Sequence, residues 1–346
     1  MSVPTDGLPP PREAAEALRD LALGKWICQA VYVAADLGIA DLLRDGARTA
    51  DELARTTGVS ADALARLLRA LVGLGVFAQA GPDRFALAPM GAWLRSDLPG
   101  SLRGFCRMVG HPDTWRAWGD LRESVRTGEE AFARLFGVGL FDHMETHPDL
   151  AGIFQDAMGS ISGMETVAVL DAYDFGGIGT LLDVAGGHGF LLAGILKAHP
   201  QMRGVLFDMP HARAGGAALM AREGLADRCR VVTGDMFAEV PGGADACIMK
   251  HIVHDWDDAR SLTILRNCHQ ALPAGGKLVV VDMVIPPGPE PHFGKLLDLE
   301  MLVVTAGGRE RTAAEFERLY GEAGFELTRV VPTAAPVSVV EGRKRA

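Results

Sequence analysis

Between Thr180 and Asp258 the chain repeats one pattern, in which a short apolar run ends in glycines or in a carboxylate. The first run leads into the glycine loop 185–189, and the next two end at Asp208 and Asp235. Short apolar strands that alternate with helices are typical of a doubly wound, Rossmann-like α/β sheet, which binds its ligand at the carboxyl ends of the strands. We predict strands over 180–185, 203–208, 229–233, 244–250, 277–283, 326–331 and 336–340, and helices over 189–199, 211–223, 258–271 and 312–324.

The N-terminal part follows a different pattern. Apolar residues recur at helical spacing over 13–43, and the capping-box sequence that begins at Thr49 predicts a short helix over 51–57. A second helix over 61–73 and a hairpin over 76–87 follow. Helix, turn, helix and hairpin together form a winged-helix unit.

A winged helix suggests DNA binding, but the charges favour another role. A recognition helix needs basic and polar residues on its outer face, whereas 61–73 offers only Arg66 and Arg69 among alanines and leucines. The net charge of −10 also repels a nucleic-acid backbone. We therefore expect no nucleic-acid partner and a dimerisation scaffold in this part of the chain.

The glycine loop and the two carboxylates predict a nucleoside site. Glycine lets a backbone approach a ligand where a Cβ would collide, but Leu192 stands where dinucleotide-binding loops have their third glycine, which argues against NAD. Asp208 can accept hydrogen bonds from both ribose hydroxyls, and Asp235 can accept one from an adenine amino group. Met236 and Phe237 follow and can pack against the purine. In this order at successive strand ends, these residues favour an adenosyl ligand.

Five motifs carry a family resemblance: Asp-Val-Ala-Gly-Gly-His-Gly from Asp183, Phe-Asp-Met-Pro from Phe207, Gly-Asp-Met-Phe from Gly234, Lys-His-Ile-Val-His-Asp-Trp from Lys250 and Gly-Gly-Arg-Glu-Arg-Thr from Gly307. In their order they resemble those of S-adenosylmethionine-dependent O-methyltransferases of the caffeate/isoflavone type and their bacterial polyketide relatives. The resemblance covers nearly the whole chain and implies a homodimer with S-adenosylmethionine as cofactor. One departure is Ala185, where the family usually has glycine. We expect alanine to be accepted there because its φ stays below zero.

The resemblance also implies roles for single residues. The family's base falls on His254, and the carboxyl residues that orient it fall on Asp282 and Glu310. The implied cofactor-binding residues are Asp183, Gly186, Gly187, Asp208, Met209, Gly234, Asp235, Met236, Phe237, Lys250 and Trp256.

The position of His254 supports a base role independently, because it follows a strand end beside the expected cofactor. Methyl transfer is an in-line displacement, so much of the acceleration can come from fixing the two reactants in line. A phenol has a pKa near 10 and a histidine about 6.5, so complete proton transfer beforehand costs about 5 kcal/mol. We expect His254 to take the proton as the C–O bond forms, with a carboxylate on its other nitrogen. For His251 and His269 we expect structural roles in loops or helix caps.

We place the domain boundary near residue 105, with a helical winged-helix dimerisation domain over 1–105 and a catalytic domain over 106–346. The helical segment 106–170 is expected to line an apolar substrate pocket. Candidate pocket residues are Trp115, Phe154, Met158, Asp255 and Met301. The Pro-rich residues 1–12 are predicted to be disordered. No apolar run approaches the roughly 18 residues of a membrane span, and the five cysteines have no CxxC spacing, so we expect a cytoplasmic protein with reduced thiols and no membrane partner.

The sequence thus predicts transfer of a methyl group to a phenolic hydroxyl of an aromatic secondary metabolite. No metal is expected, because the histidines form no ligand pattern and no carboxylate cluster suggests a magnesium site. A family member with non-methylating chemistry, such as hydroxylation, decarboxylation or a pericyclic reaction, is the alternative. A winged-helix regulator that binds an adenosyl ligand as an effector is a third hypothesis.

Overall fold

The computed structural model of the protein describes residues 12–345. It contains two compact units. The first comprises the described residues up to Pro112 together with Gly152–Ala157, and the second comprises Asp113–Ala151 and the described residues from Met158 onward. The predicted disorder of the Pro-rich N-terminus concerns residues that lie outside the described part, apart from Arg12.

The first unit contains the predicted winged helix. Its elements are α1 (Arg12–Ala22), α2 (Gly24–Asp36), α3 (Ile39–Leu42), β1 (Arg48–Thr49), α4 (Ala50–Thr57), α5 (Ala61–Gly73), β2 (Phe77–Gln79), β3 (Arg84–Leu87), α6 (Pro89–Ala92) and α7 (Arg103–Gly110). Thr49 forms the predicted capping box with Glu52, and the Ser60 hydroxyl caps α5. The predicted hairpin strands pair with β1 in a three-stranded sheet of order β1-β3-β2. Leu53, Leu68 and Phe77 are buried in the core of this unit.

The second unit begins with helices and continues as an alternation of strands and helices. The helical segment consists of α8 (Pro112–Gly119), α9 (Leu121–Thr127), α10 (Ala131–Phe136), α11 (Leu140–Thr146) and α12 (Pro148–Ala172), of which Pro112 and Gly152–Ala157 belong to the first unit. There follow β4 (Thr180–Val184), α13 (Phe190–Ala198), β5 (Arg203–Asp208), η1 (Pro210–Ala212), α14 (Arg213–Arg222), β6 (Cys229–Thr233), β7 (Ala246–Lys250), η2 (Val253–Asp255), α15 (Asp258–Ala271), β8 (Lys277–Asp282), α16 (Gly294–Val304), α17 (Ala313–Glu322), β9 (Phe325–Pro332) and β10 (Ser338–Lys344).

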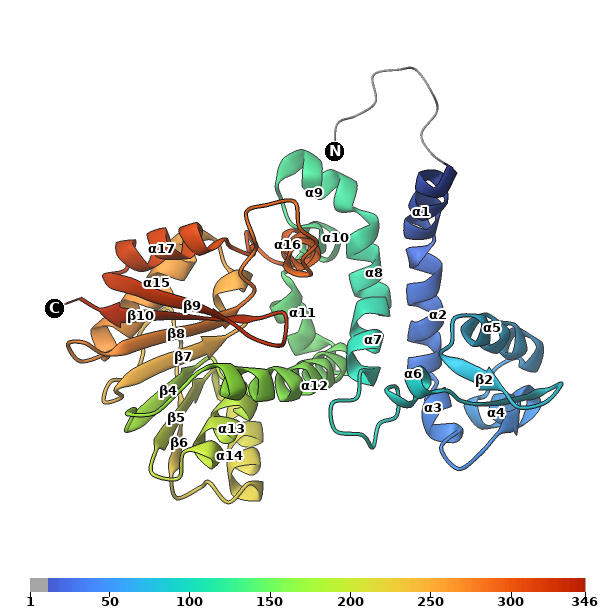
Figure 1. Ribbon diagram of the computed structural model, residues 1–346, viewed down its shortest axis with the longest axis horizontal. Helices are drawn as coiled ribbons and strands as arrows, with labels where there is room; N and C mark the ends of the chain where they lie inside the picture. The colour runs from blue at the N-terminus through green and yellow to red at the C-terminus, as the bar shows by residue number, and fades with distance from the viewer. Residues whose placement is uncertain (1–11, 346) are drawn as a thin grey trace. The chain divides into compact units, whose positions relative to one another are not determined.

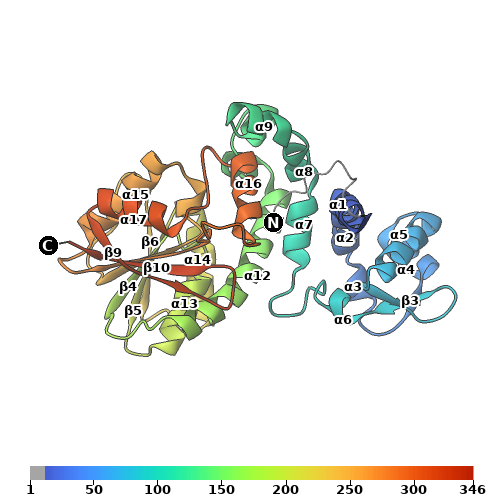
Figure 2. The same ribbon diagram turned by 45° about the horizontal axis from the view of Figure 1, so that its top comes forward.

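The strands of this unit form one sheet of order β6-β5-β4-β7-β8-β10-β9. Helices α13 and α14 cover one face, and α15 and α17 cover the other (Figures 1 and 2). The strand period of two assigns the residues of β7 to these faces, because Ala246 and Ile248 join the core under α13 while Cys247 and Met249 join the core under α15. Both faces are therefore buried, as the nearly continuous apolar runs of the sequence require.

The doubly wound sheet is confirmed, and each predicted strand overlaps its observed counterpart. Two features were not predicted. Helix α16 lies between β8 and α17, and β10 pairs antiparallel with both β8 and β9, which turns this edge of the sheet into a mixed one. Because β4 and β7 are parallel neighbours, their carboxyl ends meet at the middle of the sheet, where the strand order reverses.

Candidate active site

The glycine loop after β4 is shaped by close packing and by left-handed backbone. A Cβ on Gly186 would lie 2.5 Å from Cγ of Asp183, whereas a Cβ on Gly187 would meet no atom within 4 Å. Gly187 and Gly189 have φ of +57° and +82°, which favour glycine, and Gly189 precedes α13. Gly186 is thus fixed by packing against the protein, while Gly187 leaves the outer surface of the loop open to a ligand.

Ala185 corrects one of our expectations, because its φ is +55° rather than negative. Its backbone N–H donates to the carbonyl of Phe207 at 2.8 Å, which holds the residue in this conformation. The left-handed region costs an alanine about 1–2 kcal/mol. The protein therefore tolerates strain at the position where the family that it resembles usually has glycine.

Replacing Ala185 with glycine should stabilise the protein by up to about 1 kcal/mol, since glycine adopts a positive φ without a Cβ clash. Thermal unfolding should shift upward by a few degrees. The control is Ala218→Gly in the exposed interior of α14, where φ suits alanine and the same exchange should cost about 1 kcal/mol. Equal losses of stability in both variants would contradict the argument.

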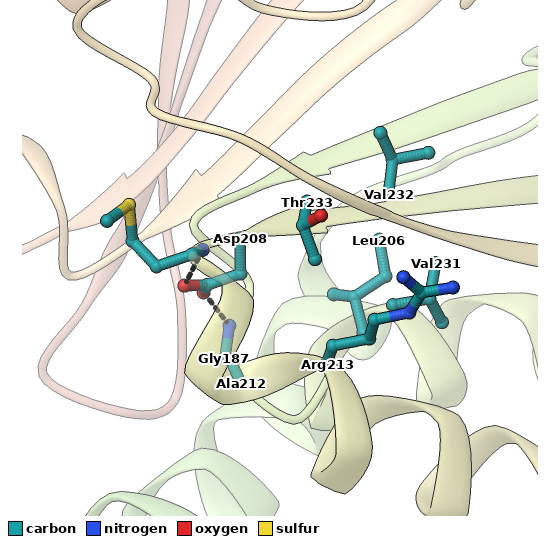
Figure 3. A pocket seen from close by; sticks show the side chains of 9 residues that line it. Gly187, Leu206, Asp208, Ala212, Arg213, Val231, Val232 and Thr233 are labelled. Carbon is teal, nitrogen blue, oxygen red and sulfur yellow. Dashed lines mark hydrogen bonds between the residues drawn. The ribbon is translucent and has the colours of Figure 1, made fainter.

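Asp208 lies at the end of β5 beside the glycine loop (Figure 3). Its carboxylate accepts hydrogen bonds from the backbone N–H groups of Gly187 and Met209, both at 2.6 Å. The same pocket is lined by Arg213 on α14 and by Thr233 at the end of β6. Each oxygen of Asp208 keeps a second lone pair, so the carboxylate can also accept from ribose hydroxyls. Burial and then the charge of Asp208 raise the pKa of the neighbouring Asp183 to about 7.

The loop after β6 places the predicted purine-binding residues together. Asp235 is exposed and accepts from the backbone of Phe237 at 2.8 Å. The ring of Phe237 meets that of Trp256 edge to face, with 4.8 Å between centroids. Trp256 Nε1 is buried and has no hydrogen-bond partner among the described residues. Asn267, which was not predicted, fixes the loop by donating to the carbonyls of Met236 and Phe237 at 2.9 and 3.0 Å.

Three residues distant in sequence meet at the proposed base. His254 lies in η2 and is 7% exposed, Asp282 ends β8 and is 0% exposed, and Glu310 is 3% exposed. His254 Nδ1 lies 2.8 Å from Glu310 Oε1 and 3.9 Å from Asp282 Oδ1. Its other nitrogen, Nε2, lies 3.5 Å from Asp255 Oδ1. Glu310 therefore makes the direct hydrogen bond, which fixes a proton on Nδ1. In the neutral ring, Nε2 then has a free lone pair that can accept a proton from a substrate.

The carboxylates around His254 change its protonation. Burial lowers the pKa of His254, but the nearby carboxylates of Asp282, Asp255 and Glu310 raise it by more. The net result is a pKa of about 10. Burial raises the pKa of Asp255 to about 6, against the opposing charge of His254. The raised pKa favours the doubly protonated ring of His254 when no positively charged ligand is bound, so that Nε2 must lose a proton before it can accept one.

Arg311 holds the segment that carries His254. Its side chain is 1% exposed and donates to the carbonyl oxygens of Val253 and Trp256 at 2.8 and 2.9 Å, and to Asp258 at 2.9 Å. Gly308 allows the backbone before Arg311 to lie close to the backbone of His254, since a Cβ on Gly308 would lie 2.5 Å from the carbonyl oxygen of His254. Arg311 belongs to a motif quoted above, but only its burial shows that it is structural.

Three further residues, His251, Lys250 and Glu165, form contacts beside His254. His251 is not a helix cap: its Nε2 lies 2.9 Å from Glu165 Oε1, and its ring stacks on that of His254. Lys250, which was predicted to contact the cofactor, donates to Glu165 Oε2 at 2.9 Å. Glu165, on α12, was missed. Its signal in the sequence is that it carries the one charge between Ala157 and Leu170.

The candidate pocket residues do not form one group in the described contacts. Asp255 lies beside His254, as given above, and Met301 is 6% exposed in a core cluster with Phe132 and Val304. Trp115 and Met158 are half-buried in the second unit, whereas Phe154 belongs to the first. A pocket role for these residues stays a prediction.

Two further observations concern metals and membranes. Among residues 12–345, one set of potential metal ligands lies within 4.8 Å, namely His251, His254 and Asp282. Hydrogen bonds to Glu165 and Glu310 already engage one nitrogen of each histidine. That no metal takes part stays a prediction. No helix in the described part of the chain is long and apolar enough to cross a membrane.

Comparison with known families agrees with this fold. Residues 118–326 match the O-methyltransferase domain, and residues 19–97 match the O-methyltransferase dimerisation domain. The chain therefore belongs to the S-adenosylmethionine-dependent O-methyltransferases and is an enzyme of that class.

Relatives match over nearly their full length. Phenazine O-methyltransferase PhzM of Lysobacter antibioticus is 45% identical over 94% of this chain and 95% of its own length. The mitomycin biosynthesis 6-O-methyltransferase of Streptomyces lavendulae is 39% identical over 96% of this chain and 95% of its own length. Among solved structures, CalO1, a methyltransferase in calicheamicin biosynthesis in its S-adenosylhomocysteine-bound form, superposes with a TM-score of 0.84, 38% identity and coverage of 98% and 100%.

Proposed function

We propose that this enzyme methylates a phenolic hydroxyl of an aromatic secondary metabolite, with His254 as the general base. The observation that carries the proposal is the buried His254–Glu310 pair, 2.8 Å apart, beside the strand ends that form the adenosyl site. The relatives' names agree, because they describe O-methylation in phenazine and mitomycin chemistry. Antibiotic biosynthesis is the context that these relatives favour.

The residues of the second unit fit an S-adenosyl ligand. Gly187 leaves room for close backbone approach, Asp208 offers lone pairs for ribose hydroxyls, and the unpartnered Trp256 lies beside Phe237 at the proposed purine site. When bound, S-adenosylmethionine supplies an electrophilic methyl group on a positively charged sulfur. The chain's own contribution is to hold the acceptor oxygen in line and to receive its proton.

The proton is taken by Nε2 of His254. Glu310 accepts from Nδ1–H and so holds the ring in the tautomer whose Nε2 has a free lone pair. Because the pKa of His254 is raised to about 10, it matches that of a phenol, and the cost of about 5 kcal/mol that an ordinary histidine implies largely disappears. His254 is therefore a stronger base than an ordinary histidine, but its Nε2 must lose a proton before it can accept one from the substrate.

The pH dependence should reveal this shift. A general base acts only when neutral, and the pKa of His254 is raised, so activity should be lost as the pH falls through a value above that of ordinary histidine. In profiles of kcat/KM for the methyl donor, we expect the acidic limb above about pH 7. The limb in kcat should lie lower, because the bound positive charge of the donor opposes protonation of His254. An acidic limb at or below about 6.5 would contradict the raised pKa.

Product analysis tests the reaction itself. Purified enzyme, phenolic polyketides or phenazines and S-adenosylmethionine should yield a product about 14 daltons heavier and one equivalent of S-adenosylhomocysteine. Consumption of the acceptor with the methyl donor left intact would overturn the proposal in favour of non-methylating chemistry. The same assay without acceptor is the control for spontaneous breakdown of the donor.

We also propose a homodimer formed through the first unit, in a cytoplasmic enzyme. The match to the family's dimerisation domain supports this, as does the exposure of apolar side chains on α1 and α2. These are Leu18, Leu21, Trp26 and Ile27, which are 42–79% exposed. Such a stripe is typical of a surface that another chain covers.

A further inference from the structure

His251 lies beside the proposed base and is held firmly there. Its side chain is 14% exposed, and its ring stacks on that of His254 with 5.0 Å between centroids and 28° between planes. Its φ is +55°, a costly conformation for a residue other than glycine. Such strain persists only where the surrounding structure fixes the residue, and it is concentrated at functional sites.

Both ring nitrogens of His251 face carboxylates. Nε2 lies 2.9 and 3.0 Å from the two oxygens of Glu165, and Nδ1 lies 3.6 Å from Asp282 Oδ1. Glu165 is itself buried, with a side chain 5% exposed, and also accepts from Lys250. An imidazolium has an N–H on each nitrogen and can serve both carboxylates, whereas a neutral ring can donate to only one.

The carboxylates around His251 and His254 outnumber the basic side chains beside them, so a second positive charge would stabilise the cluster. The two stacked rings are faced by four carboxylates, from Glu165 on α12, Asp255 in η2, Asp282 on β8 and Glu310 before α17, and the basic side chain of Lys250 on β7 donates to the first of them. Neither oxygen of Asp282 has a hydrogen-bond partner among the described residues. A buried carboxylate stays ionised only if a positive charge lies close to it.

The protonation of the neighbouring groups is consistent with this charge. Burial opposes ionisation of Glu165, but the charges of His251 and Lys250 outweigh it and lower its pKa to about 2. Burial also opposes protonation of His251, and Glu165 and Asp282 outweigh it, so its pKa is raised. His251 and His254 both lie near Asp282, at 3.6 and 3.9 Å. The negative charge of Asp282 can be balanced by whichever of the two rings is doubly protonated.

We infer that His251 is a positioning residue of the methyl-transfer site: held by Glu165, it supplies the positive charge that balances Asp282, so that His254 is free to lose its proton and act as the base. The inference rests on the proposed role of His254. It assigns His251 no contact with the acceptor. Its stacked ring also fixes the plane of the His254 ring.

His251→Phe separates these two effects, because phenylalanine keeps a flat ring for stacking and removes the charge. Asp282 would then be balanced by His254 alone, which should hold its proton to higher pH. We expect the acidic limb of the kcat/KM profile to move up by about one pH unit, which lowers the rate about tenfold at neutral pH. At pH values above the shifted limb the rate should recover to within about threefold of wild type. A purely structural loss would lower the rate equally at every pH.

The matched control is His269→Phe, which exchanges a half-buried histidine on α15 whose ring packs against Phe325. Its profile should not move. If His251→Phe fails to fold, nuclear magnetic resonance of wild-type protein labelled with ¹⁵N-histidine provides the test, since His251 should keep two protonated nitrogens above the pKa of an ordinary histidine, about 6.5. A neutral His251 there, or a His251→Phe profile identical to wild type, overturns the inference. Activity that survives His254→Ala instead overturns the base role on which it rests.

Discussion

His254→Ala should lower kcat by about 10²–10⁴-fold, the contribution typical of a general base. The substitution removes Nε2, the atom proposed to receive the proton, and leaves the residues proposed to bind the adenosyl group unchanged. Single-turnover assays with saturating methyl donor and acceptor would measure the loss directly. A loss of less than about tenfold would show that positioning of the reactants, rather than proton transfer, carries the acceleration.

Two controls make this result specific. Calorimetric affinity for S-adenosylhomocysteine should stay within about threefold of wild type, because His254 is not among the residues proposed to bind the adenosyl group. Glu310→Gln offers a graded comparison. It keeps an oxygen that can accept from Nδ1–H but removes the charge that stabilises the imidazolium, so its loss should be smaller than that of His254→Ala.

Arg311→Met should lower the free energy of unfolding of the second unit by about 3–5 kcal/mol, the cost of removing one partner from a buried charged network. The change leaves the carbonyl oxygens of Val253 and Trp256 without the donor they have now. Because these residues flank His254, kcat should also fall. Urea unfolding followed by tryptophan fluorescence would measure the stability, read from the transition assigned to the second unit since the chain has two units.

Arg318→Met is a closely matched control. Arg318 donates to the same residue, Asp258, at 2.6 Å, but its side chain is 50% exposed. Exposed ion pairs contribute little to stability, so this variant should remain near wild-type stability and activity. Equal effects of the two substitutions would show that the Asp258 ion pair, and not the hydrogen bonds to the His254 segment, is what Arg311 provides.

The sequence predicted the sheet well because its signals are local. Apolar runs of strand length, punctuated by glycines and carboxylates, depend only on neighbours in the chain, and the capping boxes at Thr49 and Thr312 mark helix starts directly. Helix α16 escaped prediction because it lies among buried apolar contacts and has no side-chain cap. The antiparallel strand β10 was located, but its direction depends on which edge it joins.

The backbone conformation and the charge of single residues could not be predicted from local sequence signals. The positive φ of Ala185 follows from the hydrogen bond that ties it to the end of β5, and a residue's name does not reveal it. His251 looked like an ordinary loop histidine because its partner Glu165 precedes it by 86 residues on another element. Asn267 similarly acts on a loop 30 residues upstream.

By itself, the sequence determined the family, the doubly wound sheet and the positions of Asp208, Asp235 and His254 after the ends of its strands, because these follow from periodicity and from motifs within short segments. The tertiary structure alone decided which charged groups surround the proposed base, His254. It brings Glu165, Asp282 and Glu310 from three separate elements to two stacked histidines and removes them from water. The protonation of such groups depends on distances through a low-dielectric interior, which no spacing along the chain encodes.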